Sequence, residues 1–270
     1  MPPQLDHAGP VITPRHPDYD EARTVFAAVD RRPALIARAA SSQDVAAAIA
    51  HAREHDLPIA VRSGGHSPAG HGVVDDGVVI DLSAMRRLEI DPERRVAWAE
   101  TGLTAGAYTA AAGAHGLATP FGDAASVGIG GIATAGGAGF LVRRHGLTID
   151  DVLAAEVVTA GGERLHADAR SHPDLFWAIR GGGGNFGVVT RLKLRLHSVG
   201  RILGGMLVLP ATPEVLEGFV AEADGAPEEL SAIANVMPAP PLPFLPAEHH
   251  GRPVVMAFLA FAGDVAAGEH

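Results

Sequence analysis

Apolar and polar residues recur with two periods along the first 200 residues, one typical of helices and one typical of strands. Residues 41–57 repeat apolar side chains at helical spacing behind a capping pattern that begins at Ser41, so we expect a helix that ends before Pro58. The short apolar runs at 58–62 and 78–82 are typical of buried strands. A glycine-rich loop therefore lies between two predicted strands.

Later segments continue this mixed pattern. Residues 88–100 alternate on both sides of an Asp-Pro turn, which predicts a hairpin, and a second hairpin is expected around Gly161 and Gly162. Residues 104–116 and 172–180 predict short helices. A half-exposed antiparallel strand is expected at the end, because Val188, Thr190, Leu192, Leu194 and Leu196 share one face while Arg191, Lys193 and Arg195 share the other.

The character of the chain changes after about residue 200. A strand at 202–210, a helix opened by Thr212 and Pro213, a proline-rich loop at 238–246 and an apolar strand at 253–263 indicate a second region. Helices and strands in this irregular order predict the α+β class.

The amino-acid composition excludes some classes of binding partner. The 21 basic and 31 acidic residues give a net charge of -10, which lacks the basic surface that nucleic acids or anionic lipids require. No run approaches the roughly 18 apolar residues of a membrane span, and the N-terminal residues lack the apolar core of a signal peptide. We therefore expect a cytoplasmic protein with a small-molecule partner and no contact with nucleic acid or membrane. The absence of cysteine excludes thiolate ligands and cysteine nucleophiles.

Several common interpretations of the glycine and histidine motifs fail. Residues 181–187 contain G-x-G-x-x-G, but a dinucleotide-binding turn follows a strand and opens a helix, whereas here the predicted helix comes first. The G-x-G-x-x-A match at 128–133 lacks a convincing preceding strand. No G-x-S-x-G nucleophile motif occurs. His66 and His71 lack the helical i, i+4 spacing of a zinc pair, and no carboxylate completes a triad by spacing, so we expect no metal site.

The loop RSGGHS at residues 62–67 offers a different chemistry. Its consecutive N–H groups can form a concave anion site, and Gly64 and Gly65 would let a diphosphate approach where a side chain would collide. Arg62 either adds charge there or braces the loop. A plain glycine turn with a surface histidine explains the stretch equally well. The second glycine-rich segment, residues 122–140, favours a cofactor, because a large cofactor needs two walls and because so many glycines are unusual in an ordinary core element.

Together these segments resemble the flavoproteins of the p-cresol methylhydroxylase (PCMH) and vanillyl-alcohol oxidase superfamily, specifically the berberine bridge enzyme-like branch. RSGGHS is similar to the family's pyrophosphate loop, and the match continues in order through VVIDLSAM, SVGIGGIATAGGAGFLVRRHGLTIDDVLAAEVVTAGGE and HPDLFWAIRGGGGNFGVVTRLKLRL. The resemblance is dense over residues 30–200 and thin thereafter. It implies a PCMH-type FAD-binding domain of two α+β subdomains at residues 1–200 and an incomplete antiparallel-sheet substrate domain at 201–270.

The resemblance implies FAD as cofactor and places specific residues around it. His66 stands where the family's histidine is bonded to the 8α-methyl carbon of FAD, and Ala124 replaces the cysteine of a second tether, so a single covalent attachment is expected. Non-covalent FAD beside a hydrogen-bonding His66 is the alternative. The cofactor-binding residues implied by the match are Arg62, Ser63, Gly64, Gly65, His66 and Ser67 in the first segment, Asp123, Ser126, Val127, Gly128, Gly130 and Gly131 in the second, and Val189 near the adenine.

The resemblance also implies an activity. Members of the family are oxidoreductases, so we expect hydride removal from an alcohol- or amine-bearing small molecule to the flavin. Val127 lies where the family is thought to gate dioxygen, and a small side chain there favours an oxidase over a dehydrogenase. Tyr19 and Tyr108 match no catalytic position, so the catalytic residue stays unassigned.

The length of the chain favours a second interpretation. Family members run well beyond 270 residues, and residues 254–270 (VVMAFLAFAGDVAAGEH) resemble a central strand of the substrate domain. The alternative expectation is therefore a truncated flavin-binding fragment without catalytic activity.

Overall fold

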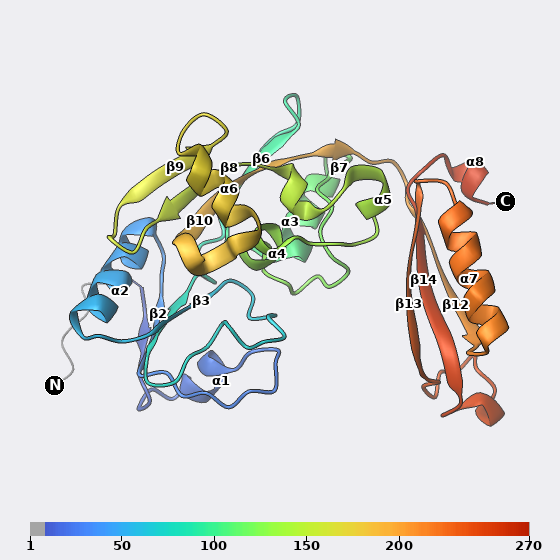
Figure 1. Cartoon of the computed structure of the whole chain (residues 1–270), viewed down its shortest axis with the longest axis horizontal. Coiled ribbons are helices and arrows are strands. Elements are labelled where there is room, and N and C mark those ends of the chain that lie inside the picture. Colours follow the sequence, from blue (N-terminus) through green and yellow to red (C-terminus); the bar gives the residue numbers. More distant parts are fainter. Residues whose placement is uncertain (1–8, 270) are drawn as a thin grey trace. The chain divides into compact units, whose positions relative to one another are not determined.

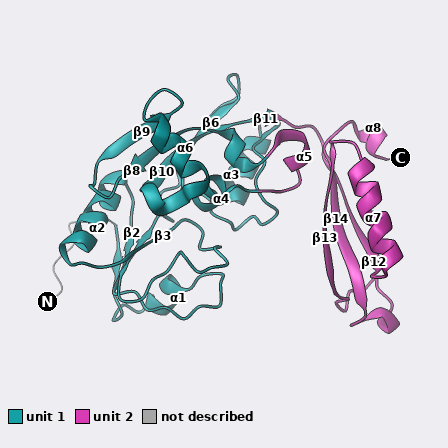
Figure 2. Cartoon of the chain, viewed as in Figure 1, with its two compact units in different colours: residues 1–137, 147–197 teal, residues 138–146, 198–270 magenta. Residues whose placement is uncertain are grey.

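The computed structural model describes residues 9–269. The chain forms two compact units (Figure 2). The first contains residues up to 137 and residues 147–197, and the second contains residues 138–146 and the residues from 198 onward. Each unit combines helices with sheets that include antiparallel pairs, so the predicted α+β class is confirmed.

A four-stranded sheet in the order β1, β2, β4, β3 lies in the first unit (Figure 1). Its strands are Val11–Ile12 (β1), Leu35–Arg38 (β2), Ile59–Arg62 (β3) and Val78–Asp81 (β4). Strands β2, β4 and β3 run parallel, so their last residues, Arg38, Asp81 and Arg62, are in register at one edge of the sheet. Helix α2 (Ser42–Glu54) packs its predicted apolar face against these strands, and Ser41 caps it. The predicted helix and both predicted strands are confirmed.

The second sheet of this unit has the order β5, β6, β10, β8, β9, with every neighbouring pair antiparallel. Its strands are Leu88–Asp91 (β5), Val96–Glu100 (β6), Val152–Val158 (β8), Arg164–Asp168 (β9) and Val188–Arg195 (β10). Both predicted hairpins are present. Leu192 and Leu194 are fully buried while Arg195 is exposed, which confirms the alternation predicted for β10.

Helices cover the apolar face of this second sheet (Figure 1). Tyr108, Ile129 and Ile179, one from each of three helices, lie in the same buried cluster as Leu192. These helices are Ala105–Gly113 (α3), Ile129–Ala135 (α4) and Pro173–Gly182 (α6). The remaining short elements of this part of the chain are Tyr19–Arg23 (α1), Leu117–Ala118 (β7), Thr148–Asp151 (η1), Gly183–Phe186 (η2) and His197–Ser198 (β11).

Part of the glycine-rich segment 122–140 is a buried helix. Residues 129–135 form α4, and Ile129 and Ala133 are fully buried. Glycines at 128 and 130 let this helix approach Ser63 and Thr101 closely, so its large side chains can face the core.

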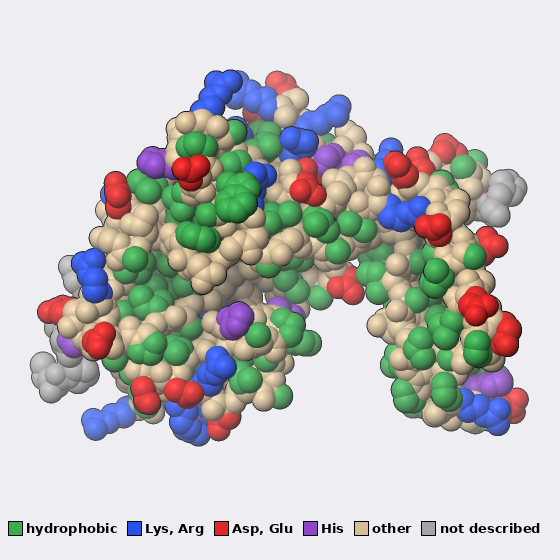
Figure 3. Space-filling model, in the orientation of Figure 1, with side chains coloured by type: hydrophobic (Ala, Val, Ile, Leu, Met, Phe, Trp, Pro, Cys, Tyr) green, Lys and Arg blue, Asp and Glu red, His purple; other side chains and the backbone are tan. Residues whose placement is uncertain are grey.

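The second unit is built on a three-stranded antiparallel sheet in the order β12, β14, β13. Its elements are Val142–His145 (α5), Leu203–Pro210 (β12), Pro213–Gly225 (α7), Leu230–Pro238 (β13), Ala247–His249 (η3), Pro253–Phe261 (β14) and Val265–Gly268 (α8). The central position expected for the strand at 253–261 is confirmed. The space-filling view shows hydrophobic side chains on the surface of this unit (Figure 3), and Leu207, Val236 and Phe258 are among those exposed.

Within residues 9–269, no helix combines the length and the apolar character that crossing a membrane requires.

Candidate FAD site

A buried ion pair holds the start of the glycine-rich loop. The Arg62 guanidinium, 8% exposed, contacts the Asp81 carboxylate (Nη2 to Oδ2, 2.9 Å) and donates to the Ala22 carbonyl. Arg38 approaches the same carboxylate oxygen at 3.2 Å. These contacts suit the bracing role considered for Arg62.

The environment of Asp81 keeps its carboxyl group ionised. Burial by itself would raise the pKa of Asp81, but the charge of Arg62 and the Ser83 N–H, which donates to Oδ1 at 3.0 Å, outweigh burial and hold this pKa below its usual value. Asp81 therefore forms a charged pair with Arg62 at the carboxyl edge of the parallel strands.

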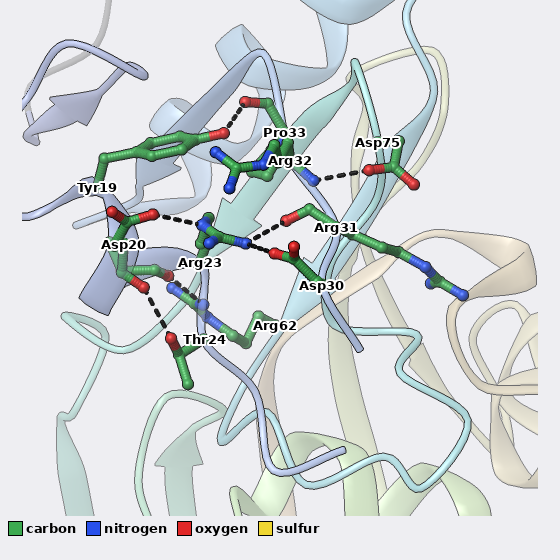
Figure 4. Close-up of polar contacts among 11 residues, drawn as sticks. Tyr19, Asp20, Arg23, Thr24, Asp30, Arg31, Arg32, Pro33, Arg62 and Asp75 are labelled. Carbon is green, nitrogen blue, oxygen red and sulfur yellow. Dashed lines mark hydrogen bonds and ion pairs between the residues drawn. The ribbon is translucent and has the colours of Figure 1, made fainter. Parts of the chain in front are cut away.

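An N-terminal segment, residues 19–33, contacts the loop and the residues that follow it, and Figure 4 shows part of it near Arg62 and Asp75. Arg31 donates to the Gly70 carbonyl at 2.9 Å, and the Arg32 N–H donates to Asp75 Oδ1 at 2.7 Å. Inside the segment, Tyr19 donates to the Pro33 carbonyl, and Arg23 contacts the carboxylates of Asp20 and Asp30. These contacts join the N-terminal segment to residues 70–75, which follow the loop.

The two glycine-rich segments meet backbone to backbone. A Cβ atom on Gly64 would lie 2.9 Å from Gly128 Cα and 3.0 Å from the Ser126 carbonyl oxygen, and a Cβ on Gly130 would lie 2.8 Å from Thr101 Cβ. Real Cβ atoms do not approach other atoms so closely. The absence of a side chain at Gly64 therefore allows contact with the second segment, and this is its visible function.

The loop carries four consecutive backbone N–H donors. Among residues 9–269, the N–H groups of Gly64, Gly65, His66 and Ser67 donate to no protein acceptor. Gly65 has a φ of 70°, which favours glycine. Four consecutive unused donors suit a diphosphate, because backbone N–H groups of this kind bind phosphate oxygens. In the second segment, a Cβ on Gly131 would meet nothing within 4 Å, so this side of α4 is open.

A pocket of about 350 Å³ brings residues of both segments together. The first segment contributes Arg62, Ser63 and Gly64, and the second contributes Ser126. Charged side chains of both signs also line the pocket, namely Asp18, Glu21, Arg38, Asp81 and Arg86. The remaining candidates of the second segment lie close by in sequence, with Asp123 exposed and Val127 partly buried.

Thr101 connects residues that the sequence had assigned separately. Its backbone carbonyl accepts from Ser63 Oγ, and its own Oγ1 donates to the Val189 carbonyl at 2.7 Å. Thr101 is fully buried. Sequence reasoning missed it because a lone threonine after a strand belongs to no motif, and only its position between the two segments and β10 reveals the role.

His66 lies in the loop with its ring against an aromatic side chain. The side chain is partly buried, and its ring stacks on Phe26 with centroids 4.9 Å apart and planes 16° apart. Within the described part of the chain, neither ring nitrogen has a hydrogen-bond partner. Sequence reasoning missed Phe26 as well, because no motif connects a residue of the N-terminal segment with the loop.

The two tyrosines are structural. Tyr19 donates to the Pro33 carbonyl at 2.7 Å, and the Tyr108 hydroxyl lies 2.9 Å from Thr119 Oγ1. Both are buried, and burial raises the pKa of both phenols. Neither is suited to accept a proton from a substrate, so the catalytic residue remains unassigned. Residues 9–269 contain no group of three histidine and carboxylate side chains that could hold a metal ion.

This arrangement is that of a flavoprotein domain, and comparison with known proteins identifies the family. A family model described as FAD binding domain matches residues 33–168, about half of the chain. The chain therefore belongs to this FAD-binding family, and the resemblance to the berberine bridge enzyme-like branch is confirmed.

Individual relatives agree with this classification. The (R)-6-hydroxynicotine oxidase of Paenarthrobacter nicotinovorans is 36% identical over 229 residues, which are 84% of this chain and 50% of that protein. A crystal structure of 6-hydroxy-D-nicotine oxidase from Arthrobacter nicotinovorans covers 100% of this chain and 59% of its own, with 31% identity and a TM-score of 0.90. Xylooligosaccharide oxidase from Myceliophthora thermophila gives 28% identity and a TM-score of 0.82 over 97% of this chain and 55% of its own. The chain thus spans about half the length of these relatives.

Proposed function

We propose that this chain belongs to an FAD-dependent oxidase that removes hydride from an alcohol- or amine-bearing small molecule, with the cofactor attached covalently to His66. The observation that carries the proposal is the loop at 64–67, where four unused N–H donors adjoin a histidine whose ring nitrogens have no partner in the described chain. The first feature suits a diphosphate, and the second leaves a nucleophilic nitrogen available.

Residues of the two glycine-rich segments would contact different parts of the cofactor. FAD, when bound, would accept the hydride. The N–H groups of residues 64–67 would hold the diphosphate, and the open side of Gly131 would lie along the flavin and its phosphates. Val189 would contact the adenine side through its backbone. Arg62 would act on the site through the loop that it braces.

Dioxygen is the proposed electron acceptor. Val127 would leave room for dioxygen beside the flavin, because its side chain is small. The relatives described above are named oxidases, which supports the same acceptor. Their names point to an amine and to an oligosaccharide, so a screen of amines and sugars would test the substrate class.

We further propose that residues 1–200 form the FAD-binding domain and that residues 201–270 belong to a substrate domain. The three-stranded sheet with β14 at its centre supports this assignment of the second region.

The absorption spectrum and the intact mass of the purified chain, before and after acid precipitation, test the proposed cofactor. We expect a yellow precipitate with the mass of one FAD added, and we expect His66→Ala to lose this added mass while keeping the native circular dichroism spectrum. Flavin that stays entirely in the acid supernatant of the wild type would contradict the tether. A colourless protein would contradict the FAD site itself. Covalent flavin without turnover of any amine or sugar would favour the alternative, a chain that binds flavin but has no activity.

A further inference from the structure

Phe26 lies over His66 although it gains little from burial. The two rings are nearly parallel, with centroids 4.9 Å apart, and the Phe26 side chain is 73% exposed. A core phenylalanine is normally buried almost completely, because the free energy of burial depends on the area removed from water. The position of Phe26 is therefore not explained by core packing.

Backbone and side-chain contacts fix Phe26 against the loop. The Phe26 N–H donates to the Gly65 carbonyl at 2.9 Å, so the chain is bonded to the residue next to His66. The neighbouring Val25 also contacts this loop, with its Cγ1 3.6 Å from the Cβ position of Gly65 and 3.7 Å from that of Gly72. Val25 packs against the glycines, while Phe26 stacks on the imidazole.

We propose that Phe26 is a positioning residue for covalent attachment of FAD, which it promotes by holding the imidazole of His66 in one orientation. This inference rests on the proposed function, since it presupposes the bond to His66. The second side-chain torsion of histidine is broad, so an unsupported imidazole samples many orientations. An aromatic ring stacked on one face restricts this rotation, because it holds the plane of the imidazole.

The atoms and electrons of the attachment step balance as follows. The new bond joins a ring nitrogen of His66 to the 8α-methyl carbon and replaces one C–H bond of that methyl group. The electron pair of the C–H bond, with the methyl proton and the imidazole proton, reduces the isoalloxazine, and dioxygen takes up both electrons and two protons as hydrogen peroxide. Phe26 enters none of these bonds, so its removal should slow attachment without preventing it.

The test compares the rate of attachment in Phe26→Ala, Phe26→Leu and Phe26→Trp with that of the wild type. Full-length chain from riboflavin-limited cells is mixed with saturating FAD, and acid-insoluble flavin and intact mass are followed over time. We expect Phe26→Trp to match the wild type and the other two variants to be about 3- to 10-fold slower, which corresponds to about 0.6–1.4 kcal/mol in the barrier. The dissociation constant for FAD, compared between His66→Ala and the double variant with Phe26→Leu, should stay unchanged.

Phe244→Ala is the matched control, because Phe244 is an aromatic residue of the second unit with a 62% exposed side chain. It should attach FAD at the wild-type rate. Equal rates for wild type and Phe26→Leu would overturn the inference and leave the tether to His66 intact. A wild type without acid-insoluble flavin would overturn both. If Phe26→Ala fails to fold, the comparison between leucine and tryptophan decides, since both fill the position and only one is aromatic.

Discussion

At the scale of single residues, glycines in the second segment differ in what surrounds them. A Cβ on Gly128 would collide with the backbone of Ser63 and Gly64, whereas a Cβ on Gly131 would meet nothing within 4 Å. The first kind of glycine is needed for the contact between the two segments. The second kind has no structural reason within the described chain, and a cofactor lying against α4 would supply one.

Alanine substitutions at Gly64 and Gly131 should therefore have opposite effects on stability. Gly64→Ala forces the two segments apart, and we expect it to lower the free energy of unfolding by about 1–3 kcal/mol. Gly131→Ala fills open space in a helix, so stability should rise by up to about 1 kcal/mol, while FAD affinity should fall because the methyl group takes cofactor space. Urea unfolding measures the stability, and FAD titration in the His66→Ala background, where no tether forms, measures the affinity. Unchanged FAD affinity in Gly131→Ala would argue against a cofactor on this side of α4.

At the scale of elements, local sequence patterns predicted those helices and strands that depend on the spacing of apolar and turn residues. The helix at α2, the hairpins and the alternation of β10 follow from hydrophobic periodicity and turn residues, and all are present. The RSGGHS loop was found because glycines and a histidine form a recognisable pattern. The roles of Thr101 and Phe26 were not predicted, because both depend on contacts between residues far apart in the sequence. Thr101 contacts residues 38 and 88 positions away, and Phe26 contacts a loop residue 40 positions away. No local pattern contains that information.

Asp81, at the edge where three parallel strands end, should make the free energy of unfolding depend on pH in the acid range. The pKa of Asp81 is lower in the folded chain than its ordinary value of 3.8, so the native state binds this proton less readily than the unfolded state. Its contribution is therefore present above about pH 4 and lost as the pH falls through the folded pKa. We expect the free energy of unfolding of the wild type to decline below about pH 4 more steeply than that of Asp81→Asn.

Near neutral pH the same variant should be less stable than the wild type by about 3–5 kcal/mol, because Arg62 keeps its buried charge without a carboxylate partner. Chemical unfolding from pH 3 to pH 7 measures both effects. Asp75→Asn is a control, since Asp75 accepts from the Arg32 N–H near the protein surface. Parallel pH profiles for wild type and Asp81→Asn would contradict the assigned role of the pair.

At the scale of the whole molecule, the chain leaves the first unit after α4 and returns before η1. The intervening residues 138–146 belong to the second unit (Figure 2). Arg143 holds them there by donating to the carbonyls of Ala223 (2.8 Å), Ala226 (2.7 Å) and Leu230 (3.1 Å). These carbonyls lie at the end of α7 and the beginning of β13, where helix carbonyls lack partners and a positive charge is favourable.

Arg143→Ala should therefore loosen residues 138–146 and the end of α7, while the backbone amides in the sheets of the first unit keep their protection from hydrogen exchange. We expect faster amide hydrogen exchange in these two stretches, by a factor corresponding to about 1–2 kcal/mol. Arg143→Lys should restore little, because an ammonium group cannot serve three carbonyls with the fork of a guanidinium. Arg201→Ala is the matched control, since Arg201 is an exposed arginine of the same unit for which residues 9–269 provide no hydrogen bond or ion pair. Exchange that rises equally in the control, or throughout the first unit, would show that Arg143 does not hold this segment in place.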